Sequence, residues 1–166
     1  MTFTESLLRE MEKESATTRK MLERVPADHY DWKPHEKSMS LRQLATHVAE
    51  IPGWTPTVLN TTEMDFAKMD YKPHPVNSPA DLIQYFETSL DKGKKALAAA
   101  SDNQLLNETW TMRNGDTILA KDSKLDTLRD CFCQVVHHRA QLGVYLRLLN
   151  VPIPGSYGPS ADDASF

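Results

Sequence analysis

The sequence predicts an all-α protein, an up-and-down four-helix bundle with a small β-hairpin inserted before the last helix. Proline is absent from residues 1–25, 35–51 and 80–151, so these three segments can form long helices. Within the longest of them, Asn114-Gly115 separates two short runs rich in threonine and apolar residues, 109–113 and 117–119, which is typical of a hairpin. Because a single hairpin is not stable alone in water, we expect it to lie against the helices.

The composition is that of an ordinary folded domain. Of the 166 residues, 40% are hydrophobic and 25% are charged, and this length can bury a core without disulfides or a structural metal. There is no internal repeat and no long linker, so residues 1–166 are expected to form a single domain. Cys131 and Cys133 are too few for a disulfide framework and are expected to be small buried side chains, with redox chemistry as the alternative.

Charge and hydropathy disfavour several classes of function. A net charge of −4 lacks the basic surface that nucleic-acid binding needs, so no nucleic-acid partner is expected. No apolar run approaches the roughly 20 residues needed to cross a bilayer, so no membrane association is expected. The first ten residues are charged and periodic, unlike a signal peptide, which predicts a cytoplasmic protein.

The first two helices are predicted from capping residues and apolar spacing. Thr2 and Glu5 fit a capping box for a helix over residues 4–23. Ser40 and Gln43 fit a second capping box. The apolar residues that follow it recur at helical spacing: Leu41, Leu44, Val48 and Ile51. Pro52-Gly53 then interrupts this helix, which we expect to continue past a kink.

The remaining elements follow from similar signals. Residues 65–77 are polar and contain two prolines, so a loop is expected there. Ser78 before Pro79 is a typical start for a third helix, which we expect to end near residue 100. Ser123 with Asp126 begins a fourth helix that runs to about residue 149. Residues 151–159 are rich in proline and glycine and are expected to be extended.

Three of the six histidines lie on the predicted helices. His47 lies at the edge of the apolar face of the second helix, while Gln134 and His138 lie four residues apart on one flank of the fourth. These three side chains can meet between the two helices. His137 lies farther round the fourth helix and is expected to reach solvent or a neighbouring subunit. The spacing leaves two interpretations open: a metal site, or ordinary hydrogen-bonded histidines at the edge of the core.

Two neighbours of these histidines bear on the choice. Gln134 weakens the metal interpretation, because zinc prefers imidazole, thiolate and carboxylate, whereas an amide oxygen suits harder ions. Arg139 falls within the apolar stripe of the fourth helix, where an unpaired charge is costly. It is expected either to form a salt bridge with an acid of the first or second helix, such as Glu50, or to anchor an anionic substrate.

Two helical motifs resemble those of a known superfamily. The run His137-His138-Arg139-Ala140-Gln141 resembles the HHRGQ signature of the DinB/YfiT-like superfamily. Residues 38–49, which contain His47, are similar to its first histidine motif. The tail, residues 152–162, resembles the ending of one branch of the superfamily. The resemblance spans nearly the whole chain, with the motifs in the same order.

The resemblance implies a four-helix bundle, expected as a homodimer, that holds a divalent metal, zinc or nickel. Carried over to this chain, the metal ligands are His47, Gln134 and His138. Gln134 departs from the histidine or glutamate usual at that position, and Ala140 replaces a glycine. Three nearby residues are candidates for contacting a substrate or for supporting the metal ligands: Arg139, Gln141 and Tyr145.

Characterised members of the superfamily include transferases and isomerases that use low-molecular-weight thiols such as mycothiol or bacillithiol. An open metal position favours the thiolate form of such a cosubstrate. The resemblance therefore implies a metal-dependent, thiol-dependent S-transferase or isomerase acting on a small-molecule substrate. The alternative is a non-catalytic bundle whose metal site has degenerated at Gln134, which binds a small apolar or anionic ligand or acts through dimerisation.

Overall fold

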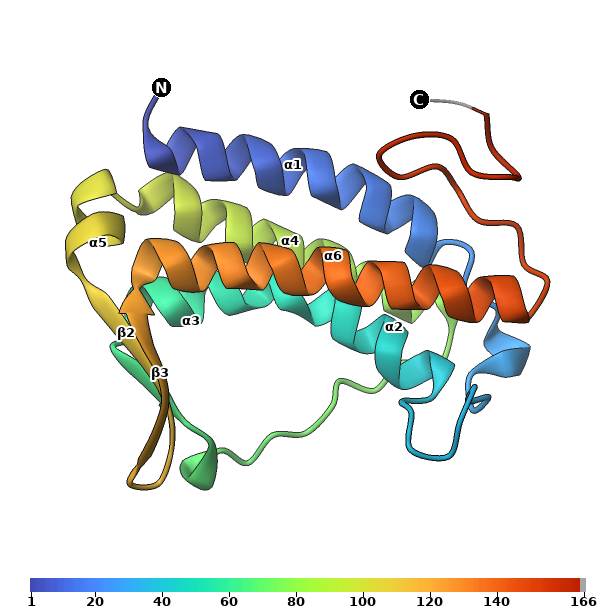
Figure 1. Ribbon diagram of the computed structural model, residues 1–166, viewed down its shortest axis with the longest axis horizontal. Coiled ribbons are helices and arrows are strands. Elements are labelled where there is room, and N and C mark those ends of the chain that lie inside the picture. The colour runs from blue at the N-terminus through green and yellow to red at the C-terminus, as the bar shows by residue number, and fades with distance from the viewer. Residues whose placement is uncertain (165–166) are drawn as a thin grey trace.

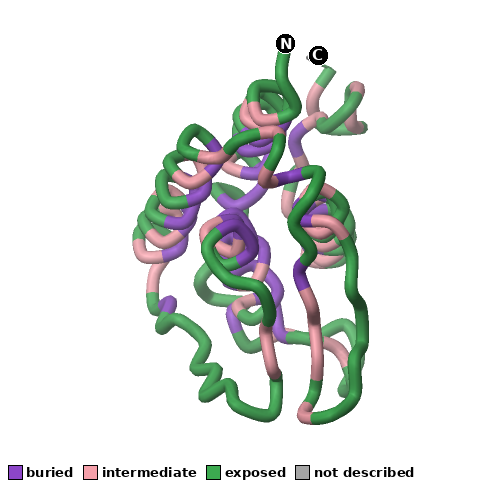
Figure 2. The backbone as a smooth tube through the Cα atoms, turned by 90° about the vertical axis from the view of Figure 1, so that its left-hand side faces the viewer, coloured by how far each residue is buried: buried purple, intermediate pink, exposed green. Residues whose placement is uncertain are grey.

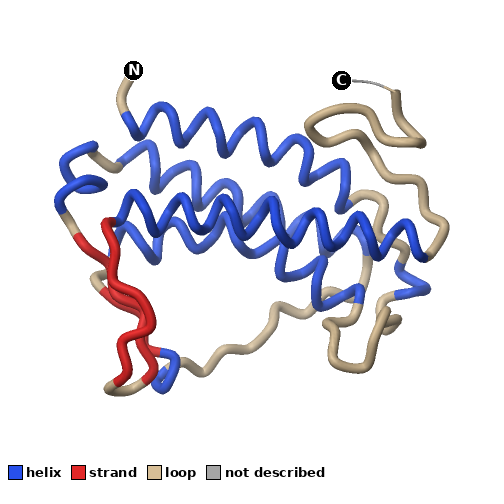
Figure 3. Tube along the Cα trace, viewed as in Figure 1, coloured by secondary structure: helices blue, strands red, loops and turns tan. Residues whose placement is uncertain are grey.

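The computed structural model describes residues 1–164, and helices dominate it (Figure 1). The α-helices are α1 (Phe3–Leu22), α2 (Leu41–Glu50), α3 (Thr55–Asn60), α4 (Pro79–Ala99), α5 (Asp102–Asn107) and α6 (Lys124–Leu148). Short 3-10 helices cover Ala27–His29, Ile51–Trp54 and Phe66–Lys68. The strands are β1 (Glu63–Asp65), β2 (Thr109–Asn114) and β3 (Thr117–Ser123), and they gather at one end of the helices (Figure 3).

The caps predicted from the sequence set the helix starts. Both capping boxes are present, with Thr2 paired to Glu5 at α1 and Ser40 paired to Gln43 at α2. The Ser78 side chain accepts a hydrogen bond at the start of α4, and the Ser123 side chain does the same at α6. Each of these four helices therefore begins at the capping residue that the sequence predicts.

The core lies between the long helices. Helices α1 and α2 each pack against both α4 and α6, and the buried residues line the inner faces of these helices (Figure 2). At one crossing the packing depends on a glycine, because a Cβ built on Gly93 of α4 would lie 2.5 Å from the carbonyl oxygen of Pro52. No helix among residues 1–164 is both long and apolar enough to span a membrane.

The all-α fold class is not confirmed, because three strands form one sheet in the order β1-β2-β3. The predicted hairpin is confirmed as the antiparallel pair β2–β3, with its turn at Gly115, whose positive φ of 58° suits glycine. Strand β1 pairs in parallel with β2 and was not predicted. Three residues carry too little pattern to reveal a strand whose partner lies far along the chain.

The helical part also differs from the expected four-helix bundle. After Glu50 the second helix passes into a 3-10 turn at Pro52 and then into the short α3, which confirms the expected kink. Helix α5 was not predicted at all. A regular four-helix bundle is therefore not confirmed, and the fold is mostly helical with a small sheet.

Candidate functional site

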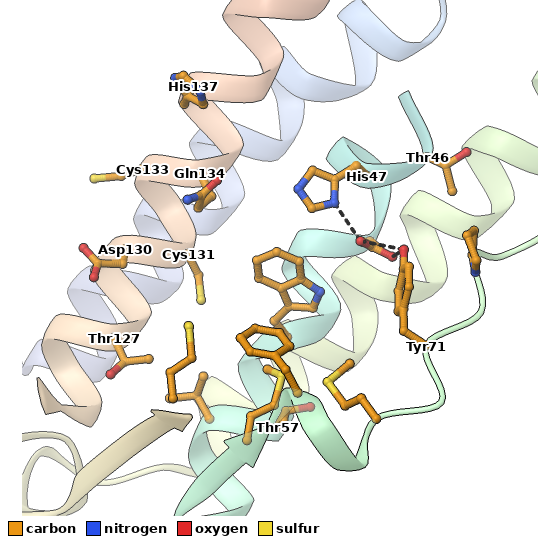
Figure 4. Close-up of a pocket in the computed structure, with 18 of the residues that line it drawn as sticks. Thr46, His47, Thr57, Tyr71, Thr127, Asp130, Cys131, Cys133, Gln134 and His137 are labelled. Atoms are coloured by element: carbon orange, nitrogen blue, oxygen red, sulfur yellow. Dashed lines mark hydrogen bonds and ion pairs between the residues drawn. The ribbon is translucent and has the colours of Figure 1, made fainter. Parts of the chain in front are cut away.

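A cavity of about 1010 Å³ lies between α2, α3, α6 and the sheet. The irregular segment 69–77, which links the 3-10 helix Phe66–Lys68 to α4, runs along its outer side (Figure 1). His47 on α2 and Gln134 on α6 both line this cavity (Figure 4). Two of the three predicted ligand positions therefore face one space.

The orientation of His47 is set by a buried carboxylate. Its Nδ1 lies 2.7 Å from Oε1 of Glu50, whose side chain is 8% exposed. Because a carboxylate can only accept, Nδ1 is the donor in this bond, and Nε2 is not engaged by Glu50. Glu50 is also held by the Tyr71 hydroxyl, which donates to its two oxygens at 3.0 and 3.2 Å (Figure 4). Burial, with the charge of Glu50, raises the pKa of Tyr71 to about 12, so this hydroxyl stays protonated.

His138 of α6 lies beside His47. The centroids of the two imidazole rings are 4.6 Å apart, with the rings nearly perpendicular at 77°. His138 Nδ1 lies 2.8 Å from Oε1 of Gln141, so Nδ1 is the donor there and Nε2 is not engaged by Gln141. Burial lowers the pKa of His138, and His47 and His137 lower it further, while the bond to Gln141 opposes them. The site therefore places two imidazoles side by side, each with its Nδ1 held by a neighbouring side chain.

Gln134 lies one helical turn before His138 and adds an uncharged amide. Within residues 1–164, no group of three or more His, Cys, Asp or Glu side chains is placed to hold a metal ion. His137 is exposed, as predicted, and it also lines the cavity, with its ring centroid 4.8 Å from that of His138. The donor set at the site is thus two imidazoles and one amide, with a third imidazole nearby.

Arg139 lies on a different side of α6 from this cavity. Its side chain is 2% exposed and pairs with Glu14 of α1 at 2.7 Å. Its guanidinium also donates to Thr18 Oγ1 and to the Tyr157 hydroxyl, both at 3.0 Å. The predicted salt bridge with an acid of the first helix is confirmed, but Glu50 is not the partner. With its donors engaged in the core, Arg139 is not positioned to anchor a substrate in the cavity.

The other two predicted neighbours have distinct places. Gln141 holds His138, as described above. The Tyr145 hydroxyl donates to the carbonyl oxygen of Met39 at 3.2 Å, and its ring packs edge-on against Trp32 at a centroid distance of 5.6 Å. Tyr145 therefore supports the segment that leads into α2.

Sequence reasoning missed the support around His47. Glu50 is three residues after His47, a spacing that places the two side chains on one helix face and that could have revealed the pair. The Trp54 ring lies 5.4 Å from the His47 ring. Tyr71 comes from an irregular segment, so no periodic signal marks it. His74 in the same segment stacks on Tyr85 of α4 at 4.0 Å, which ties the segment to the helices.

A model of the DinB family matches residues 1–165 of the chain. The chain belongs to the DinB family. The DinB-like protein YjoA of Bacillus subtilis has a similar structure, with a TM-score of 0.70 at 21% identity over 91% of this chain and 97% of that one. A DinB-like protein of Bacillus cereus ATCC 10987 gives 0.69 at 21% identity, covering 91% and 95% of the two chains. A DinB family protein of Exiguobacterium sibiricum 255-15 gives 0.68 at 21% identity, covering 93% and 97%.

At 21% identity these likenesses establish the fold of this DinB family member and nothing about its chemistry. No curated protein matches its sequence significantly. The chemistry of this chain is therefore inferred from the residues of the site itself.

Proposed function

We propose that this DinB family member binds a divalent metal between α2 and α6, with His47 and His138 as nitrogen ligands and the Gln134 amide oxygen as the third. The observation that carries the proposal is the pair of imidazole rings 4.6 Å apart, each with Nδ1 engaged and Nε2 available. Metal-binding histidines commonly donate their other ring nitrogen to a carboxylate or carbonyl, which is the role of Glu50 and Gln141 here.

The residues present fit zinc or nickel, although less tightly than a three-histidine set. Imidazole suits both metals, and the His47–Glu50 pair is the usual support for such a ligand. Gln134 contributes an uncharged oxygen, which is a weaker donor for these ions. We therefore expect a metal that is bound but exchanges readily.

The reaction proposed for the site is thiol-dependent S-transfer or isomerisation of a small molecule. When bound, the metal would favour the thiolate form of a low-molecular-weight thiol. The chain itself supplies a cavity of about 1010 Å³ that holds the second substrate beside His47. Glu50 keeps His47 in one orientation.

A second candidate function is ligand binding without catalysis, by a site that has lost its metal at Gln134. It is favoured by the absence, within the described part of the chain, of a cluster of three strong metal ligands. In this case the cavity is the functional feature, and the histidines are structural. The predicted homodimer, whose formation light scattering would test, would then be part of the function.

Metal binding decides between the two candidates. Protein purified without a histidine tag is stripped with chelator and titrated with nickel or zinc in a calorimeter, as wild type, His47→Ala and Gln134→His. We expect one ion per chain for the wild type, loss of binding for His47→Ala, and tighter binding for Gln134→His. His29→Ala, in the 3-10 turn between α1 and α2 and outside the cavity lining, is the matched control and should bind as the wild type does.

If only Gln134→His binds metal, the wild-type site is degenerate and the second candidate is correct. If the wild type and His47→Ala bind equally well, the metal lies elsewhere and the proposed site is wrong.

A further inference from the structure

The wall of the cavity is rich in methionine and tryptophan. Met39, Met64, Met69 and Met112 come from four separate places in the chain, and Trp54 and Trp110 add two large aromatic faces. Methionine is polarisable and unbranched, so it adapts to the outline of a ligand and makes favourable contacts with aromatic rings. Such a wall suits a flat hydrophobic molecule better than a sugar or a peptide.

The cavity is also large for the chemistry of the proposed metal site. Small-molecule sites typically measure roughly 300–1,000 Å³, and this one reaches about 1010 Å³. A metal ion with a small thiol would occupy only the end beside His47. The rest, toward the sheet and segment 69–77, has room for a molecule of two or more rings.

The charges around the cavity are mainly negative. Asp122 on β3 and Asp130 on α6 are exposed at its edge, and Glu50 lies deeper. Among the described residues that line the cavity, Arg42 is the one Lys or Arg, and its guanidinium is bonded to Asp31 at 3.1 Å. The lining therefore holds three acids, Glu50, Asp122 and Asp130, against one arginine, and this excess of negative charge disfavours an anion.

We infer that the cavity binds a predominantly aromatic, neutral or cationic small molecule and discriminates against anionic analogues of it. This inference deepens the proposed function, because it names the chemical class of the molecule held beside His47. It depends on the cavity wall and its charges, and it requires no bound metal.

Two fluorescent probes with one skeleton provide the test. N-phenyl-1-naphthylamine is neutral, whereas 8-anilino-1-naphthalenesulfonate carries the same rings and one negative charge. We expect metal-free protein to bind the neutral probe saturably, with a blue-shifted emission, and to bind the sulfonate at least about tenfold more weakly because of like-charge repulsion. Equal or tighter binding of the sulfonate would overturn the inference.

Substitutions then locate the probe and identify the charges. Ala120→Trp fills the cavity from β3 and should abolish binding of the neutral probe, whereas Ile118→Trp, on the same strand but away from the lining, should not. Asp122→Asn with Asp130→Asn should raise sulfonate affinity about threefold, the size expected for partly screened charges. Asp116→Asn in the hairpin turn is the matched control. Unchanged probe binding in a folded Ala120→Trp variant, checked by circular dichroism, would show that the probe lies elsewhere and would overturn the inference.

Nickel titration of the same samples separates this inference from the metal proposal. Probe binding without nickel binding supports the ligand class and contradicts the metal site. Nickel binding without probe binding does the reverse.

Discussion

Two buried glutamates, one on each side of α6, are bound in similar ways and serve different ends. Glu14 of α1 accepts a hydrogen bond from Tyr157 of the C-terminal tail at 2.8 Å, and Glu50 of α2 accepts one from Tyr71 of segment 69–77 at 3.0 Å. In both cases an irregular segment brings a tyrosine to a buried carboxylate. The difference lies in the third partner.

The third partner of Glu14 is Arg139, a permanent cation that is 2% exposed and whose donors are engaged. The third partner of Glu50 is His47, whose second ring nitrogen is left available beside a cavity. A fully satisfied network stabilises the fold, whereas a network that leaves one acceptor open can bind a ligand. Arg139 thus belongs to a network that stabilises the fold, whereas its neighbour in the sequence, His138, lies beside His47.

The largest expected effect is a loss of stability when the Glu14–Arg139 network is broken. Arg139→Ala leaves the Glu14 carboxylate buried without its cation and should lower the free energy of unfolding by about 3–5 kcal/mol. Urea denaturation followed by circular dichroism measures this loss. The double variant Arg139→Met with Glu14→Leu removes both charges and should recover most of it. A loss below about 1 kcal/mol for the single variant would contradict the assignment of this network to stability.

At the Glu50–His47 pair we expect a loss of metal affinity rather than a loss of stability. Glu50→Gln removes the carboxylate that orients His47 and should weaken nickel binding by about 10–100-fold. Calorimetric titration measures the affinity, and urea denaturation should show a smaller stability change than Arg139→Ala does. Glu87→Gln, in an ion pair with Arg19 away from the cavity, is the matched control. Unchanged affinity in Glu50→Gln would mean that Glu50 does not support a metal ligand.

The two tyrosines compare the two sides directly. Tyr157→Phe removes hydrogen bonds to both members of a buried ion pair and should cost about 1.5 kcal/mol of stability. Tyr71 bonds the Glu50 carboxylate alone, so Tyr71→Phe should cost only about 0.5 kcal/mol. Parallel urea titrations give both values. Equal costs would show that the two tyrosines contribute equally to stability, contrary to this expectation.

The smallest effect concerns the attachment of the tail that carries Tyr157. The Arg147 guanidinium, with the backbone N–H of Ile153, holds the pKa of Asp162 below its ordinary value. Because this pKa is lowered in the folded protein, the stabilisation is present above the unfolded pKa and is lost as the pH falls through the folded one. The difference in melting temperature between wild type and Asp162→Asn should therefore shrink to nothing in strong acid. A difference independent of pH would contradict this.

The sequence predicted what is decided locally. Ser40 and Gln43 cap α2 within one turn, and this start fixes the face on which His47 lies. Gln134 and His138, four residues apart, likewise share one face of α6 by helix geometry. The contact between His47 and His138 was predicted because each lies on the flank of its helix that faces the other.

What could not be predicted depends on contacts between distant segments. Arg139 had acids available on both neighbouring helices, and the choice of Glu14 over Glu50 depends on how α1 and α2 are rotated against α6. Tyr71 belongs to a segment without periodicity, so only the folded chain shows that it reaches Glu50. Strand β1 exists only through its pairing with β2.

That pairing has a consequence for the order of folding. Strands β2 and β3 are joined by a two-residue turn, so this hairpin can form within about 1–10 μs. Glu63 of β1 must find Thr111 of β2 across α4 and α5, and such a distant contact carries a large loop-closure cost. We therefore expect the cavity, whose wall includes Met64 of β1 and Met112 of β2, to be among the last features to form and the first to open.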